Sequence, residues 1–176
     1  LAARMQPGAV AGHDLLVDWF NVLITVEALL GGAFLFVGRD TAYRDINPIR
    51  GTYRVVRQTA PALQVLADVL QDLGPGRVRW HLDRSVSNVG RVKERLGAVA
   101  EERGLGWDVE VSDAVDSTLA ATPAPVVTSD SAILEEADAW LPLEALVHQR
   151  HVPAAHVVDL RPDGERSSLF PCPELS

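Results

Sequence analysis

The 176-residue chain is poor in cysteine, in lysine and in long apolar runs, and each shortage excludes a class of protein. Its one cysteine, Cys172, lies between two prolines, which excludes a disulfide framework, a CxxC redox pair and a zinc site built on cysteines. No run of about 18 consecutive apolar residues occurs, so we expect no membrane-spanning helix and no membrane partner. These shortages favour a soluble protein of a reducing compartment, and we expect it in the cytoplasm.

The length and composition fit a single globular domain. With 47% hydrophobic and 23% charged residues, the chain is long enough to bury one core and short for two domains. We place the domain at residues 12–160. Residues 1–11 start at Leu1 and lack the features of a secretory signal, so we interpret them as a truncated or loosely ordered N-terminus. Residues 161–176 are interpreted as a loosely ordered C-terminal tail.

The net charge of −8 is unevenly distributed, which bears on the choice of partner. Residues 1–100 carry 12 Lys or Arg against 9 Asp or Glu, whereas residues 101–176 carry 4 against 15. Ten arginines lie between Arg39 and Arg95, and the planar guanidinium group suits phosphate. The acidic total therefore does not exclude a nucleic acid, although a genome that favours arginine over lysine would produce the same excess, since Lys93 is the only lysine.

Short apolar runs alternate with segments of helical periodicity along the chain. Strands are expected at residues 13–17, 33–37, 77–82, 107–111, 126–127 and 156–158. Helices are expected at residues 21–30, 49–73 with a break near Pro61, 87–103, 114–121, 131–137 and 143–149, and a polar loop at 38–48. Strands that alternate with helices predict an α/β protein with three α/β/α layers around a mainly parallel central sheet.

Acidic residues stand where the expected strands end, namely Asp18, Asp83, Asp113, Asp116, Asp130 and Asp159. Because the carboxyl ends of parallel strands meet at one edge of the sheet, these side chains are expected to lie close together. Clustered carboxylates repel one another unless a cation neutralises them, and ligation by oxygen alone selects Mg²⁺ or Mn²⁺ over zinc. The pattern predicts a divalent metal site suited to the attack of water on a phosphodiester.

Taken singly, each of these residues has a simpler structural interpretation. An aspartate after a strand commonly caps the next helix, and Asp130 fits that role. Asn21, Thr128 and Ser129 stand beside the acids, where they are expected either to cap backbone groups or to contact the substrate, since a helix N-terminus attracts phosphate. Glu27, nearly two turns beyond Asn21 on the first helix, is a supplementary candidate ligand.

Two segments, Val17–Leu23 and Thr128–Leu134, resemble motifs of the PIN-like nucleases, the superfamily that includes the PIN and NYN domains. The first resembles the opening strand and turn of that family, and the second its later Thr/Ser-x-Asp motif. Asp83 matches the acid after the second strand of the NYN branch, and Asp113 or Asp116 matches the acid before the short helix that precedes the Thr/Ser-x-Asp strand.

Two further segments, Arg50–Arg54 and Leu82–Asn88, make the chain look like an uncharacterised prokaryotic PIN-like family from about Leu15 to about Leu160. The resemblance implies a PIN-like, Rossmann-like fold and a metal-dependent endoribonuclease that uses Mg²⁺ or Mn²⁺. RNA is the expected partner and DNA the second choice, and a homodimer is left open.

The residues implied by this resemblance and by the acid pattern fall into three groups. The catalytic ligands would be Asp18, Asp83, Asp116 and Asp130. The supplementary metal ligands would be Asp113, Asp159 and Glu27. The substrate contacts would be Asn21, Arg44, Arg50, Arg54, Arg84, Asn88, Thr128 and Ser129.

Two departures from the family pattern keep a second hypothesis open. Trp19 stands where small or flexible residues are common, and Arg79 and Arg84 flank Asp83, where a cation could displace a metal or bind the phosphate that it activates. Proteins of this architecture include binding proteins without catalytic activity, because site residues and not topology decide function. The alternative is a non-catalytic RNA-binding or protein-binding regulatory module that uses the loop at residues 38–48.

Overall fold

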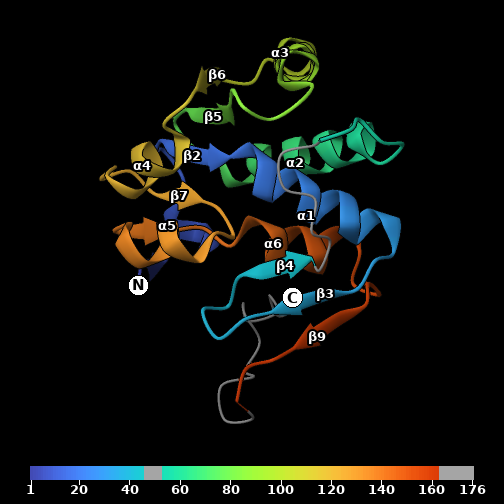
Figure 1. Ribbon diagram of the computed structural model, residues 1–176, viewed down its shortest axis with the longest axis vertical. Helices are drawn as coiled ribbons and strands as arrows, with labels where there is room; N and C mark the ends of the chain where they lie inside the picture. The colour runs from blue at the N-terminus through green and yellow to red at the C-terminus, as the bar shows by residue number, and fades with distance from the viewer. Residues whose placement is uncertain (46–52, 163–176) are drawn as a thin grey trace.

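A six-stranded parallel sheet forms the centre of the computed structural model, which describes residues 1–45 and 53–162 (Figure 1). From one edge to the other the strands are β1 (Ala3–Arg4), β8 (Ala139–Trp140), β7 (Val126–Val127), β2 (Leu15–Asp18), β5 (Val78–Asp83) and β6 (Trp107–Ser112). Every neighbouring pair is parallel. The predicted parallel central sheet is therefore confirmed.

Helices cover both faces of this sheet. One face carries α1 (Trp19–Gly31), α2 (Thr59–Leu73), α3 (Val89–Arg103) and α6 (Leu143–His151), and the other carries α4 (Val115–Ala120) and α5 (Ser131–Glu136). Side chains alternate along a strand, so Leu15 and Val17 of β2 pack in the larger core under α1 and α2, whereas Leu16 packs in the smaller core under α4 and α5. The three α/β/α layers are confirmed.

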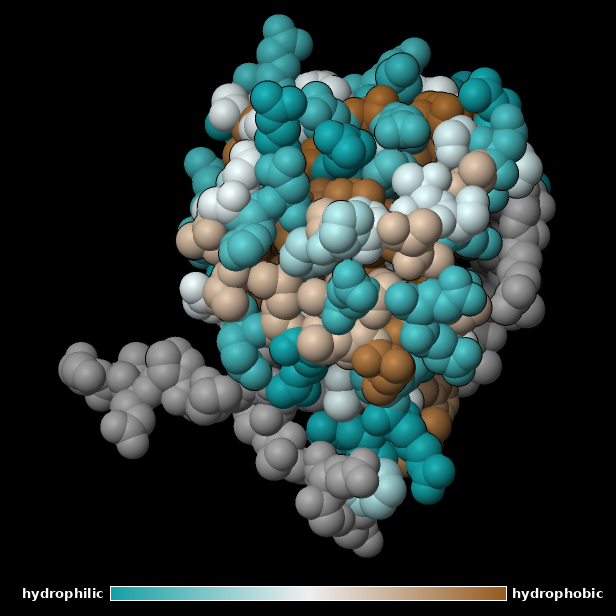
Figure 2. Space-filling view, turned by 90° about the vertical axis from the view of Figure 1, so that its left-hand side faces the viewer, coloured by the Kyte–Doolittle hydropathy of each residue, from teal (hydrophilic) through white to brown (hydrophobic). Residues whose placement is uncertain are grey.

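The face of the molecule on the side of α4 and α5 mixes hydrophilic and weakly hydrophobic side chains (Figure 2). Across residues 1–45 and 53–162, no helix combines the length and the apolar character needed to cross a bilayer.

The order of the strands reverses beside β2. The chain passes from β2 outward to β5 and β6, and then returns to the other side of β2 to form β7 and β8. Adjacent loops at such a reversal leave in opposite directions and open a crevice outside the carboxyl ends of the strands, where α/β proteins bind their ligands. The fold thus places Asp18, the last residue of β2, at the centre of this crevice.

A second, three-stranded sheet lies beside α6 and was not expected from the sequence (Figure 1). It consists of β4 (Tyr43–Asp45), β3 (Leu35–Val37) and β9 (Val157–Asp159), with β3 antiparallel to β4 and parallel to β9. The expectation of a polar loop over residues 38–48 is wrong where β4 forms, because a three-residue strand with two charged residues shows no apolar run. The strand before Asp159 belongs to this sheet and not to the central one.

Other differences from the expected elements are local. Of the helix expected over 49–73, residues 49–52 lie outside the described residues, 53–58 are not helical, and α2 begins at Thr59. Pro61 therefore lies in its first turn, where a missing backbone N–H is tolerated. The segment 1–11 was expected to be loosely ordered, yet β1 pairs with β8 and Val10 is fully buried. β8 was missed because a two-residue strand carries no periodicity. A short 3₁₀ turn, Pro7–Ala9, joins β1 to the following loop.

The larger core gives a first test of this packing. Leu66 of α2 is fully buried, so Leu66→Ala removes buried methyl groups and leaves a cavity. We expect the free energy of unfolding, measured by urea denaturation, to fall by about 2–5 kcal/mol. Gln71→Ala, on the exposed side of the same helix, is the matched control and is expected to change it by less than about 0.5 kcal/mol. Equal effects of the two substitutions would contradict the packing described.

Candidate functional site

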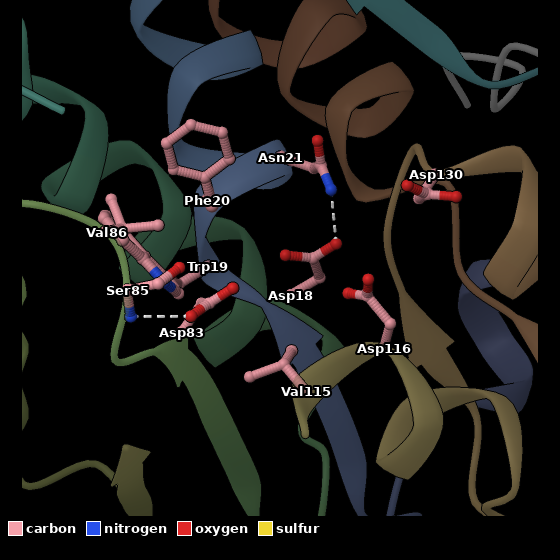
Figure 3. A pocket seen from close by; sticks show the side chains of 10 residues that line it. All are labelled: Asp18, Trp19, Phe20, Asn21, Asp83, Ser85, Val86, Val115, Asp116 and Asp130. Atoms are coloured by element: carbon pink, nitrogen blue, oxygen red, sulfur yellow. Dashed lines mark hydrogen bonds between the residues drawn. The ribbon is translucent and has the colours of Figure 1, made fainter. Parts of the chain in front are cut away.

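A cavity of about 250 Å³ opens at the carboxyl ends of the central strands (Figure 3). It is lined by Asp18, Trp19, Phe20, Asn21, Asp83, Ser85, Val86, Val115, Asp116 and Asp130. The four acids come from four segments: the end of β2, the end of β5, the first turn of α4 and the residue before α5. The structure thus brings together the four aspartates that were predicted to be catalytic.

Asp18 is the most buried of these acids, with 3% of its surface exposed. Its Oδ2 accepts hydrogen bonds from Asn21 Nδ2 at 2.5 Å and from Thr128 Oγ1 at 2.7 Å. Burial raises the pKa of Asp18, the two hydrogen bonds oppose that shift, and Asp116 adds a smaller repulsion. The carboxylate is therefore fixed in position between α1 and the end of β7, and it is electrostatically costly in its charged form.

The other three acids differ in how they are held. Asp83 Oδ1 accepts from the backbone N–H of Ser85 at 2.7 Å. Asp130 Oδ1 accepts from the N–H of Ala132 at 2.8 Å and so caps α5, the structural role expected for it. Burial raises the pKa of Asp116, and the nearby carboxylates of Asp130 and Asp83 raise it further. The cavity therefore concentrates negative charge that has no neutralising partner among its lining residues.

The donor atoms of the cavity suit a hard divalent cation, because the acids supply only oxygen. Across the described ranges, however, no three acidic, histidine or cysteine side chains lie close enough to enclose a metal ion together. Mg²⁺ commonly keeps several waters and takes only one or two carboxylates plus substrate phosphates. The carboxylates of the cavity could hold such an ion in this way, with water completing its coordination.

Three predicted supplementary ligands lie away from the cavity lining. Glu27 is buried inside the fold, where its Oε1 accepts from the hydroxyls of Tyr53 and Thr59, both at 2.6 Å, so it connects α1 to α2. Asp159 lies on β9 of the second sheet and is hydrogen-bonded to Arg161. The expectation that these two acids converge with Asp18 is wrong, because Glu27 is hydrogen-bonded inside the core and Asp159 belongs to a different sheet.

Asp113 forms an exposed ion pair with Arg84. Arg84 Nε donates to Asp113 Oδ2 at 3.1 Å, and the two side chains are 60% and 74% exposed. Arg84 also donates to the carbonyl of Val111. Of the two acids that follow β6, the structure therefore places Asp116 in the cavity and Asp113 outside its lining.

The predicted substrate contacts are divided between the cavity and the scaffold. Asn21 and Thr128 both hold Asp18, and Thr128 Oγ1 also accepts from the N–H of Asp130. Arg44 of β4 reaches across from the second sheet and donates through Nε to the carbonyl of Ser129 at 2.9 Å. These contacts tie the strand ends together.

Thr128, Ser129 and Arg44 lie outside the cavity lining, and so do the other predicted contacts that the structure describes, apart from Asn21. Asn88 precedes α3 in a left-handed conformation, with φ of 63°, and donates to the carbonyl of Tyr53 at 2.7 Å. It therefore positions backbone. Arg54 is exposed to solvent, and Arg50 lies outside the described residues.

Residues 7–146 match the family described as domain of unknown function DUF5616. The chain belongs to this family. The DUF5616 chain is also similar to the uncharacterized protein MJ0935 of Methanocaldococcus jannaschii, with 28% identity over 124 residues. That match covers 70% of this chain and 59% of the archaeal protein, so the chain spans about three fifths of its relative. No solved structure matches the DUF5616 chain.

One acid near the site of this DUF5616 chain was not predicted from the sequence. Glu144 lies in the first turn of α6 with 2% of its surface exposed, and its Oε1 has no hydrogen-bond partner among the described residues. Burial raises its pKa to about 7, a hydrogen bond from its own backbone N–H opposes that shift, and Asp18 raises the pKa further while Arg44 lowers it. Glu144 follows the carboxyl end of β8 by four residues, but a two-residue strand shows no periodicity in the sequence that would have revealed it.

The burial of Glu144 predicts a pH dependence of stability. Its pKa in the folded protein, about 7, lies above its ordinary value of 4.5, so the folded state holds the proton more tightly and stability falls as the pH rises through that interval. Between pH 4.5 and 7 we expect the wild-type protein to lose about 3 kcal/mol of unfolding free energy relative to Glu144→Gln, measured by urea denaturation. Identical pH profiles of the two proteins would contradict this assignment.

Proposed function

We propose that this DUF5616 chain is a metal-dependent phosphodiesterase that cleaves RNA internally. The observation that carries the proposal is the meeting of Asp18, Asp83, Asp116 and Asp130 around one cavity at the strand-order reversal. These residues are spread over more than a hundred positions of the chain and come together only through the fold. Carboxylates that share a cavity without basic partners are stabilised by a cation, and hydrolysis of phosphodiesters is a reaction that such sites perform.

The residues of the cavity divide the work between positioning and proton transfer. Asn21 and Thr128 hold Asp18 in one orientation, which fixes the buried wall of the cavity. Asp116 receives no hydrogen bond that the described residues supply, and its pKa is raised by burial and by its acidic neighbours. A raised pKa makes a carboxylate a better base, so Asp116 is the group suited to accept a proton from the attacking water. A bound Mg²⁺ or Mn²⁺ would supply Lewis-acid activation of water and would shield the phosphate charge.

Exposed arginines outside the cavity support a nucleic acid as the substrate. Arg54, Arg57, Arg91 and Arg95 are solvent-exposed, and Arg84 lies exposed just beyond Asp83. Exposed cationic side chains can hold phosphates of a polynucleotide while the acids act on another one. The PIN-like resemblance of the motifs around Asp18 and Asp130 favours RNA over DNA.

The test is an RNA cleavage assay on the purified protein with labelled single-stranded and structured RNAs. We expect cleavage with Mn²⁺ or Mg²⁺ present and none with a chelator. Asp18→Asn and Asp116→Asn are expected to lower the rate at least about 100-fold, the size of effect seen for positioned acid–base groups. Asp138→Asn, which changes an exposed aspartate outside the cavity, is the matched control and is expected to retain the wild-type rate.

Two results would overturn the proposal. Cleavage that survives both cavity substitutions would show that the activity has another source. RNA binding without any cleavage, unchanged in Asp18→Asn and Asp116→Asn, would instead identify the chain as a binding module.

A further inference from the structure

The buried carboxylate of Glu144 stands at the same sheet edge as the acidic cavity but is not used in the proposed chemistry. β8 is parallel to β7, so its carboxyl end points to the edge that also carries Asp18 and Asp130. The chain leaves that end through Leu141 and Pro142 and enters α6, which packs against α1, the helix that carries Asn21. The topology therefore places Glu144 at the same edge of the sheet as Asp18.

The electrostatic neighbours of Glu144 identify its surroundings. Asp18 repels its charge and Arg44 attracts it, and Glu144 in turn disfavours the ionised form of Tyr43 on β4. Arg44 is engaged elsewhere, because its guanidinium donates to both carboxylate oxygens of Asp40 and to the carbonyl of Ser129. No ion pair joins Arg44 to Glu144 among the described residues. Glu144 thus faces one acid and one cation that is already partnered.

A buried carboxylate with one oxygen that accepts no hydrogen bond is costly in a core. Moving a charged carboxylate out of water costs several kcal/mol unless hydrogen bonds or an opposite charge compensate. Asp18, the acid that disfavours the charge of Glu144, is itself 3% exposed, so the two negative groups share a region of low dielectric. A divalent cation at Asp18 would turn that repulsion into attraction for both groups.

We propose that Glu144 is a fifth acid of this site, a positioning residue whose negative charge strengthens the binding of a divalent cation at Asp18 from the buried side. This inference rests on the proposed metal-dependent function and assigns to that site a residue outside the cavity lining. Glu144 acts through Asp18, because no described contact places it against the space where the substrate would lie.

The experiment is a titration of the full metal-free chain with Mn²⁺. Binding is measured by calorimetry and by the electron paramagnetic resonance signal of the free ion. Glu144→Gln is expected to weaken Mn²⁺ binding about tenfold or more, the range found when groups that support metal ligands are removed. Glu135→Gln changes an exposed glutamate of α5 in the same way and is expected to bind Mn²⁺ within about twofold of the wild type. Glu144→Asp keeps the charge and is expected to recover most of the affinity.

The rise in melting temperature that Mn²⁺ causes gives a second readout, and a merely structural role of Glu144 would not change that rise. Mn²⁺ is expected to raise it in the wild type and in Glu135→Gln, and to raise it much less in Glu144→Gln. If the amide is not accommodated in the fold, Glu144→Ala removes the charge with a smaller side chain, and the same weakening is expected.

The outcomes separate this inference from the proposed function. A wild type that binds Mn²⁺ and cleaves RNA, with Glu144→Gln equal to it in Mn²⁺ affinity, overturns the role of Glu144 and leaves the nuclease intact. A wild type that neither binds Mn²⁺ nor cleaves RNA overturns both.

Discussion

The hydrogen bond from Thr128 to Asp18 is the contact on which the rest of the site depends. It joins the ends of β2 and β7, the two strands between which the order of the sheet reverses. This hydrogen bond holds the buried carboxylate of Asp18 at the base of the crevice. The same hydroxyl accepts a hydrogen bond from the backbone N–H of Asp130, the residue that precedes α5. Thr128 thus contacts the side chain of Asp18 and the backbone of Asp130, and Arg44 of the second sheet donates to the carbonyl of Ser129, which lies between Thr128 and Asp130.

The negative charge of the chain has two physical origins that its total conceals. Some acids are neutralised locally, as Asp68 is by Arg103 and Asp40 is by Arg44, and these pairs stabilise the surface only slightly. The acids of the cavity have neighbours of like sign, and their mutual repulsion lowers stability in the absence of a cation. Asn21 and Thr128, which donate hydrogen bonds to Asp18, are neutral and leave that negative charge in place.

How far the sequence could predict this structure depended on the length of each element. The apolar runs before Asp18, Asp83 and Asp130 are strong signals, because buried parallel strands need them, and they led to the sheet and to the cavity. β4 and β8 are too short to show periodicity, so the second sheet, the place of Asp159 and the approach of Glu144 were not foreseen. Glu27 was misjudged because helical spacing cannot tell an acid that points at a site from one that bonds with Tyr53 in the core.

The cavity exists only in the completely folded chain. Thr128 and Asp18 are separated by 110 positions, and the acids between them reach the same edge only when β5 and β7 have paired with β2 and β6 has paired with β5. Contacts this distant in sequence form late, since each closes a long loop of chain. A complete but partly folded chain therefore possesses every aspartate of the site and lacks its geometry, so any chemistry of the cavity requires the native sheet.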